Sequence, residues 1–393
     1  LQRAEARLKA AAQKALQKRS ALFPEIDGNA QTNWQHYAKD SFFRAFAPQI
    51  PAVINEINLG LSFIYEFDFW GKNRDLFQAA QGLMRAELAE RKQAELILTT
   101  SIAYGYMQLQ FLLQKQTILQ QMKVNEATIA MIHSKRQDHA VGSISPVLQA
   151  QTDTLDVQAM LVAAQQQVQE ELHELKALAG LGQDAELEIA AVPLQQTEVA
   201  IPENLSLDLI ARRPDLLAQK ERTEALAKEV GAAKSDFYPN INLSAFAGWD
   251  SIYSWTLFRS QNYSGFVEPA IHLPIFTAGR LKAQLMEKVA LFNEAVFIYN
   301  GMILQIAQEV ADSLTAVSYL QRQIEVRELS VRSLEQEASF VARRYEHALE
   351  SQLSKLSAQN NVLEMQLLQT ALKYAKQQAN IQLIRALGGG YCD

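Results

Sequence analysis

Alternating apolar and polar residues mark a strand near the start of the chain. Between residues 56 and 69, in the run EINLGLSFIYEFDF, every second position is apolar, and only Ile64 interrupts the polar or small residues between them. A period of two over about fourteen residues is typical of a β-strand, and this strand would be longer than the five or six residues usual in globular proteins. Most of the remaining chain is rich in Ala, Gln, Glu, Leu and Lys, which favour helices. The pattern therefore predicts a mixed, mainly helical protein with a few long strands.

The chain contains an internal duplication. The segment RQDHAVGSISPVLQAQTDTLDVQ at 136–158 matches RYEHALESQLSKLSAQNNVLEMQ at 344–366, an offset of 208 residues (344 minus 136). The same offset pairs Gly71 with Gly279, and an offset of 215 (249 minus 34) pairs Trp34 with Trp249. Each half is therefore predicted to run helix, β-hairpin, long helical hairpin.

These patterns define two predicted repeats and a connection. The first repeat covers 1–182, with strands at about 26–37 and 55–69 and a helical hairpin at 71–180. The second covers 206–393, with strands at about 241–250 and 263–273 and a helical hairpin at 279–388. Segment 183–205 lacks periodicity and carries two prolines, so it is predicted to be an irregular connection. Long arms of about seventy residues would extend on the order of 100 Å, which predicts a coiled-coil-like assembly.

Four long strands in one chain leave two interpretations open. Strands of this length match those that cross a bilayer at a tilt, but about eight strands are the practical minimum for a closed barrel. Because an open sheet in lipid would leave unpaired backbone groups at its edges, several chains would have to share one barrel. The alternative is that both hairpins pack against helices of a soluble protein. Aromatic residues from Phe63 to Trp70 favour the membrane interpretation, because they would form an interfacial girdle.

Composition and charge narrow the classes of function. The chain is 48% hydrophobic and 20% charged with a formal net charge of −6, which argues against a disordered chain and against a basic nucleic-acid-binding protein. No run of about eighteen apolar residues occurs, so no helix is expected to span a bilayer. The chain starts inside a helical pattern, and we expect that a natural N-terminus, with any signal or lipid-attachment site, has been removed.

No catalytic, metal or cofactor site is predicted. His139 and His347 occupy the same position in the two repeats, so we expect a shared structural role near the helical tips rather than a metal site. Cys392 is expected to be inert. The run GGG at 388–390 follows a helix and precedes no Lys, so it is expected to end the helix rather than bind phosphate. We therefore do not expect an enzyme.

Several motifs resemble one family. The run LIARRPDLLAQKERTEALAKEVGAAKSDFYPNINLSAFAGW at 209–249 resembles the signature region of the outer-membrane efflux factors, the TolC-type family that serves tripartite pumps in Gram-negative bacteria. The run LPIFTAGRLKAQ at 273–284 is similar to the family's strand-to-helix junction, and YEFDFWGKNR to that junction in members serving major-facilitator pumps. The resemblance covers nearly the whole chain, with the motifs in order. The signature residues, which are expected to be structural and to begin a helix at the RRPD run, are Arg212, Arg213, Pro214, Asp215, Pro239 and Gly279.

The resemblance implies a homotrimer in which three chains form a twelve-stranded outer-membrane β-barrel, continuous with a twelve-helix α-barrel across the periplasm. The helical tips would form a periplasmic entrance that opens when an adaptor (membrane fusion protein) and an inner-membrane transporter of the major-facilitator or RND type dock. Outer-membrane lipid is the other implied partner, and nucleic acid is not one. The implied function is a passive exit duct for drugs or other small molecules. A duct of the same fold for type I protein secretion and a soluble coiled-coil scaffold remain alternatives.

The tip of the second half departs from the family pattern. Where many relatives have aspartates in a run like LDVLDA, this chain has LSKLSA, and Ala348 stands where a glycine is usual. We therefore expect the entrance to close by steric and hydrogen-bonded contacts rather than by an acidic ring. The residues expected to line or brace it are Leu353, Ser354, Ser357, Ser143 and Ser145. The alternative is that these residues only cap and turn helices.

Overall fold

The computed structural model describes residues 1–47, 49, 51–193 and 211–389. The chain divides into two compact units, one formed by Leu1–Arg91 and Asp215–Gly301, the other by Lys92–Pro214 and Met302–Asp393. Each unit combines segments of both sequence repeats, so the repeat boundaries at 182 and 206 stay a prediction. The end of the predicted connection, the start of the second repeat at 206, and Cys392 lie outside the described residues.

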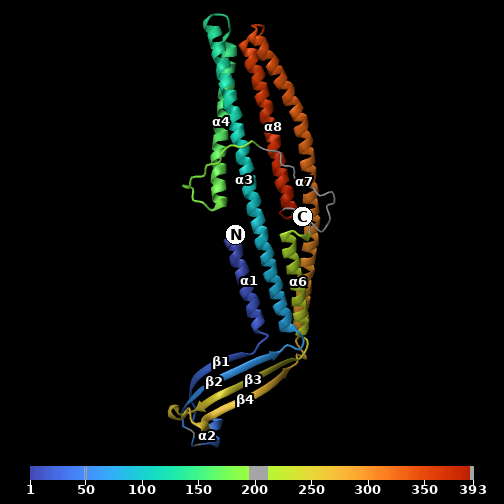
Figure 1. The fold of residues 1–393 in the computed structure, drawn as a ribbon. Helices are drawn as coiled ribbons and strands as arrows, with labels where there is room; N and C mark the ends of the chain where they lie inside the picture. Colours follow the sequence, from blue (N-terminus) through green and yellow to red (C-terminus); the bar gives the residue numbers. More distant parts are fainter. Residues whose placement is uncertain (48, 50, 194–210, 390–393) are drawn as a thin grey trace. The chain divides into compact units, whose positions relative to one another are not determined.

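The first unit carries a four-stranded antiparallel sheet with the order β1–β2–β3–β4 (Figure 1). Its strands are β1 (Glu25–His36), β2 (Val53–Phe67), β3 (Asn240–Ser251) and β4 (Tyr263–His272). The short helix α2 (Phe42–Phe46) lies between β1 and β2, and the 3-10 turns η1 (Ser254–Thr256) and η2 (Ser260–Asn262) lie between β3 and β4. All four expected strands are present, with their ends displaced by at most two residues.

Strand β2 ends at Phe67, two residues before the apolar alternation ends, because Asp68 caps the next helix. The Asp68 carboxylate accepts hydrogen bonds from the backbone N–H of Asn73, at 3.0 Å, and of Arg74, at 2.8 Å. A carboxylate in this place satisfies the first free N–H groups and interacts favourably with the helix dipole. Gly71, with φ of +77°, supplies the left-handed backbone that turns the chain from strand to helix.

Strand pairing brings the apolar positions of the four strands onto one face. Residues directly opposite each other in an antiparallel pair point to the same side of a sheet. Phe63 of β2 pairs with Ile26 of β1 and with Ala245 of β3, and Ala245 pairs with Val267 of β4. The sequence alternation is therefore that of a sheet with two different faces.

The longer helices of the first unit are α1 (Gln2–Ser20), α6 (Pro214–Ser235) and the first parts of α3 (Lys72–Asp138) and α7 (Arg280–Glu346). Buried alanines allow them to approach closely. These include Ala79, Ala80, Ala86, Ala89, Ala218, Ala225 and Ala232. Ion pairs link α3 to α6 at their exposed margins, with Arg85 2.7 Å from Glu221 and Arg222 3.0 Å from Glu90.

The second unit contains α4 (Ile144–Ala179), α8 (Gln352–Ala386) and the remaining parts of α3 and α7. In Figure 1, α3 and α4 form one hairpin and α7 and α8 another. Two apolar clusters hold α3 against α4. One consists of Leu119, Met122, Val157, Leu161 and Ala164, the other of Leu109, Leu112, Val168 and Leu175. Residues 183–193, which come after α4 in the chain, lie along α3. There Gln110 Nε2 donates to the carbonyl of Ala190 at 3.0 Å.

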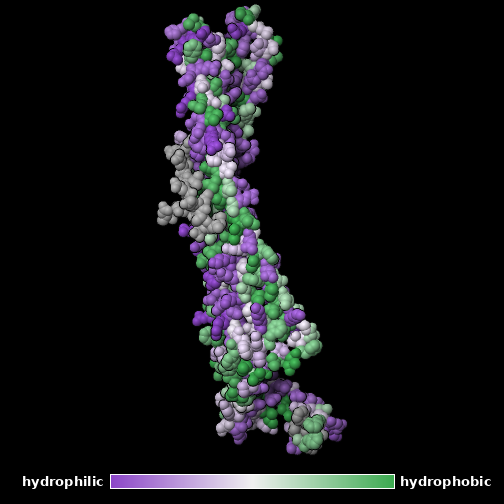
Figure 2. All heavy atoms as spheres, turned by 90° about the vertical axis from the view of Figure 1, so that its right-hand side faces the viewer, coloured by the Kyte–Doolittle hydropathy of each residue, from purple (hydrophilic) through white to green (hydrophobic). Residues whose placement is uncertain are grey.

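Apolar residues are also exposed on the helices. Figure 2, which views the side on which α7 lies, shows them in patches between polar residues. Helices α3 and α7 each contain a stretch that is long and apolar enough to cross a membrane by length and composition alone, and most of each stretch is not buried in the single chain. Such stretches also occur in helices whose apolar sides are covered by other helices. The expectation that no helix spans a bilayer stays a prediction.

Candidate functional site

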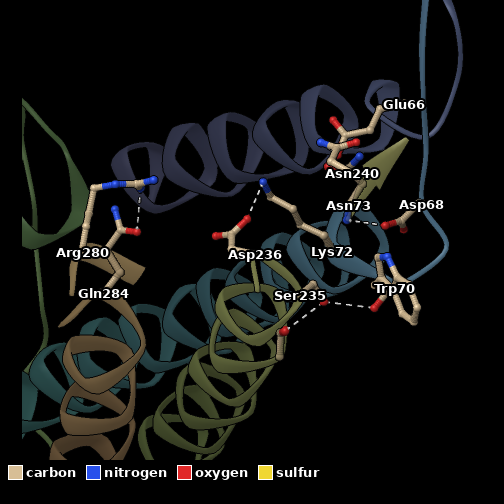
Figure 3. A network of polar contacts seen from close by, with 11 residues as sticks. Glu66, Asp68, Trp70, Lys72, Asn73, Ser235, Asp236, Asn240, Arg280 and Gln284 are labelled. Atoms are coloured by element: carbon tan, nitrogen blue, oxygen red, sulfur yellow. Dashed lines mark hydrogen bonds and ion pairs between the residues drawn. The ribbon is translucent and has the colours of Figure 1, made fainter. Parts of the chain in front are cut away.

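A polar network in the first unit holds the connection between β2 and α3 against the connection between α6 and β3 (Figure 3). The Lys72 ammonium lies 2.7 Å from the Asp236 carboxylate. Ser235 Oγ donates to the carbonyl of Trp70 at 3.0 Å, and the Trp70 indole N–H donates to the carbonyl of Pro239 at 2.8 Å. These contacts join the start of α3 to the end of α6, which lie in different sequence repeats.

Aromatic rings and a cavity flank this network. The Trp70 ring stacks on Tyr238, with ring centroids 4.6 Å apart, and the Phe67 and Phe69 rings stack at 5.7 Å. A cavity of about 310 Å³ beside them is lined by Lys72, Asp236 and other members of the network. Of the aromatic residues predicted to cluster at the end of a strand, Phe67, Phe69 and Trp70 lie where β2 meets α3 and are exposed.

The signature residues occupy several different environments. Pro214 is the first residue of α6, and Asp215 lies in its first turn, as the cap interpretation predicts. Pro239 precedes β3, and Gly279 precedes α7 with φ of +84°. The signature residues therefore lie at the starts of helices and strands rather than in one site.

Arg213 does more than begin a helix. Its side chain is buried, and Nη1 donates to Glu309 Oε2 of α7 at 2.9 Å and to the carbonyl of Ala386, the last residue of α8, at 3.1 Å. It therefore ties the C-terminal end of α8 to α7. Arg212, its neighbour, is exposed. Sequence reasoning did not distinguish the two arginines, because burial of one depends on helices more than ninety residues away.

The tips of both hairpins in the second unit have the same geometry. Ala140 and Ala348 adopt left-handed backbone, with φ of 55° and 59°. In each tip, the N–H that follows the alanine bonds back to the carbonyl of an arginine five residues earlier: Val141 to Arg136 and Leu349 to Arg344, both at 2.9 Å. This pattern ends α3 and α7 with a Schellman motif. The two tips, which the offset of 208 residues pairs in the sequence, therefore also have the same backbone geometry.

The predicted tip residues are distributed over both hairpins. Ser143 is the N-cap of α4, without a side-chain cap bond, and Ser145 is exposed in its first turn. Ser351 is the N-cap of α8 and accepts a hydrogen bond from the backbone N–H of Ser354 at 3.1 Å. Leu353 and Ser354 are half-buried, and Ser357 is exposed. In the single chain, Ser354 therefore takes part in a helix cap. That these residues line the entrance stays a prediction.

The contacts of other residues at and near the tip were not predicted from the sequence. The Lys355 ammonium lies 5.0 Å from the centre of the Tyr345 ring, and Arg344 Nε lies 3.3 Å from Glu350 Oε2. Farther from the tip, Asn360 of α8 donates to Glu126 Oε1 at 2.5 Å and accepts from Asn125 Nδ2 at 2.8 Å. This last contact joins the first hairpin to the second. Of these residues, only Lys355 stands out in the sequence, because it lies within LSKLSA, where the chain departs from the family pattern.

Comparisons with known proteins identify the family. A family model described as "Outer membrane efflux protein" matches residues 1–181 and 205–389. The multidrug resistance outer membrane protein MdtP of Escherichia coli K12 is 31% identical over 91% of this chain and 75% of its own length. The putative multidrug resistance outer membrane protein MdtQ of the same strain is 32% identical over 94% of this chain and 78% of its own length.

A solved structure has the same fold over almost the whole chain. The crystal structure of the outer membrane protein VceC from Vibrio cholerae matches with a TM-score of 0.89 and 32% identity, over 99% of this chain and 93% of VceC. These findings favour the outer-membrane interpretation of the sheet over a soluble coiled-coil scaffold. The chain belongs to the outer membrane efflux protein family, whose members are export channels rather than enzymes, and it serves as an exit duct at the outer membrane.

Proposed function

We propose that the chain acts as a homotrimer in which each copy supplies its four strands to one twelve-stranded barrel and its helices to one twelve-helix barrel. The observation that carries this proposal is the sheet itself. Its apolar positions share one face, and β1 and β4 are its edge strands among the described residues. Open edges in lipid would cost several kcal/mol for each unpaired backbone group, and sharing strands between copies removes them.

The exported cargo is proposed to be drugs or other small molecules. MdtP and MdtQ are named for multidrug resistance, which supports this cargo. The duct works with a periplasmic adaptor and an inner-membrane transporter of the major-facilitator or RND type, as a tripartite system requires. Each chain presents two helical tips of like geometry, so a trimer would offer six similar tips to its adaptor.

The entrance is proposed to lie at the tips of the helical hairpins. Leu353, Ser354, Ser357, Ser143 and Ser145 line or brace it, and the contacts of Lys355 with Tyr345 and of Asn360 with Glu126 hold it closed. In this arrangement, the contact of Lys355 with an aromatic side chain and the hydrogen bond of Asn360 take the place of the ring of carboxylates that many relatives have. The two sequence repeats, 1–182 and 206–393, are proposed to be the units that were duplicated, joined by the connection at 183–205.

The mass of the particle extracted from outer membranes in mild detergent tests the assembly. After subtraction of bound detergent, the expected mass is three times the 44.1 kDa of one chain. A particle of one chain would refute the shared barrel. Drug susceptibility of a pump-deficient strain that expresses the chain with a matching adaptor and transporter tests the cargo. Restored export of a peptide toxin without any drug resistance would favour protein secretion instead.

Thiol labelling tests the entrance. In a Cys392→Ser background, Ser354→Cys modified with a bulky maleimide should reduce single-channel conductance, because the added group would obstruct the opening. Arg212→Cys, an exposed position outside the tips, is the control and should leave conductance unchanged. Equal conductance for both labelled variants would contradict a lining role for Ser354.

A further inference from the structure

Glu171 of α4 is a buried carboxylate for which the described residues supply no partner. It is 5% exposed, and within the described part of the chain no hydrogen bond or ion pair reaches its side chain. Its neighbour Glu170, by contrast, is exposed and accepts a hydrogen bond from Gln166 at 2.8 Å. Buried carboxylates in proteins are usually paired or hydrogen-bonded, because an isolated buried charge is costly.

The Glu171 side chain lines a partly open cavity of about 410 Å³ between α3, α4 and α8. One wall is aromatic: the rings of Phe111 and Tyr374 stack with centroids 4.8 Å apart and planes 8° from parallel. Glu170, Glu174 and Lys115 also line the cavity, so three carboxylates oppose one ammonium group. The cavity therefore combines an apolar wall with an excess of negative charge.

Helix α3 leaves room for this carboxylate. A Cβ on Gly105 would lie 2.8 Å from Glu171 Oε1 and 2.9 Å from Leu175 Cδ2, so no larger residue fits without displacing them. Glycine within a helix is less favourable than alanine. At the offset of 208 residues, the second repeat has Ser313 in place of Gly105 and Ala379 in place of Glu171. The same helical hairpin thus forms without the buried acid, so folding alone does not account for it.

We propose that this cavity binds an organic monocation, a protonated or quaternary amine on an aromatic body, with Glu171 as its counter-ion and the Phe111–Tyr374 pair as its wall. The faces of aromatic rings attract cations, and the stacked rings offer apolar surface to the body of such a ligand. A metal ion fits less well, because the described residues contain no group of three or more His, Cys, Asp or Glu side chains arranged to hold one. The site lies within one chain and does not depend on the exported cargo.

Binding depends on the ionisation of Glu171. Burial, together with the nearby Glu174, raises the pKa of Glu171 to about 7. The groups that face it are Glu170 and Glu174 on α4, Lys115 on α3 and Tyr374 on α8. Burial also raises the pKa of Tyr374, which therefore stays neutral near pH 7. Because only the ionised carboxylate attracts a cation, affinity increases as the pH rises through 7.

Isothermal titration calorimetry of the detergent-purified full chain with benzyltrimethylammonium tests the site. We expect one site per chain, with affinity about tenfold higher at pH 8 than at pH 6, the ratio of ionised fractions for a group with a pKa of about 7. Benzyl alcohol, which carries no charge, should bind at least about tenfold more weakly than the cation.

Variants assign the binding to this cavity. Glu171→Gln, which removes the charge but keeps the shape, should lower affinity about tenfold and abolish the pH dependence. Asp156→Asn, an exposed carboxylate on the same helix, is the matched control and should bind like the native chain. Gly105→Ala should also weaken binding, because its methyl group occupies the space of the Glu171 carboxylate. Native affinity in Glu171→Gln, or equal binding of benzyl alcohol, would overturn the proposal. Particle mass, measured on the same samples, reports separately on the trimer.

Discussion

Replacement of Arg213 by alanine should destabilise the helical unit far more than replacement of its neighbour Arg212. Arg213 Nη1 bonds Glu309 Oε2 at 2.9 Å and the carbonyl of Ala386 at 3.1 Å, with the Arg213 side chain 9% exposed and that of Glu309 34% exposed. Hydrogen bonds involving a charged group contribute about 1.5–3 kcal/mol each. Water can reach Glu309 in the variant and replaces part of the lost interaction. The expected loss in the free energy of unfolding is therefore about 2–4 kcal/mol.

The adjacent arginine provides the control. Arg212→Ala removes the same charge from an exposed position, where substitutions usually change stability by less than about 0.5 kcal/mol. Urea unfolding of both variants, followed by helical circular dichroism in detergent, measures the difference. Arg213→Lys should fall between them, because it keeps the charge but loses the planar fork. If Arg212→Ala and Arg213→Ala unfold at the same urea concentration, Arg213 does not hold the end of α8 as the contacts indicate.

Three further substitutions test other parts of the structure. Because the pKa of Glu171 in the folded chain, about 7, lies above its ordinary value, the fold loses stability as pH rises from about 4.5 through 7. Glu171→Gln should therefore melt at a higher temperature than the native chain at pH 8 but not at pH 4.5, and an equal difference at both would contradict this. Ala348→Gly should stabilise the tip by up to about 1 kcal/mol, because alanine is strained at φ of 59°; a lower melting temperature would show that the tip is not strained. Gly60→Val should prevent assembly of the sheet, since a Cβ there would lie 2.6 Å from Phe246 Cζ. Gly28→Val, where a Cβ would meet only Leu61 at 4.0 Å, should assemble normally, as heat-modifiability on gels would show.

Periodicity predicted the elements well because each has one apolar side with a regular repeat. The strand pattern around Phe63 holds along β2, and the turns after α3 and α7 fall where the repeats match. The end of β2 was placed two residues too far along the chain. Alternation continues to Phe69, but the Asp68 side chain caps α3, and a helix cap formed by a carboxylate has no period that a strand pattern could reveal.

The polar contacts could not be predicted, because they join residues far apart in the chain. Lys72 of the first repeat forms an ion pair with Asp236 of the second repeat. Asn360 of the second hairpin donates a hydrogen bond to Glu126 of the first. In sequence, each of these residues is one of many polar residues on or next to a helix. The motif RRPD correctly indicated the start of a helix, but which arginine would be buried depends on α7 and α8.

Duplication makes the differences between the halves informative about function. Where both halves need the same geometry, they keep the same residue type, as with Ala140 and Ala348 at the two tips. Glu171, by contrast, has only Ala379 as its counterpart, and it is buried at a cost that the second hairpin avoids. A feature that costs stability and that one repeat dispenses with is better explained by binding than by folding. The cavity beside Glu171, which Tyr374 of the second hairpin also lines, is thus the place to look for a ligand, whereas the Arg213 contacts of α7 and α8 serve the stability of the second hairpin.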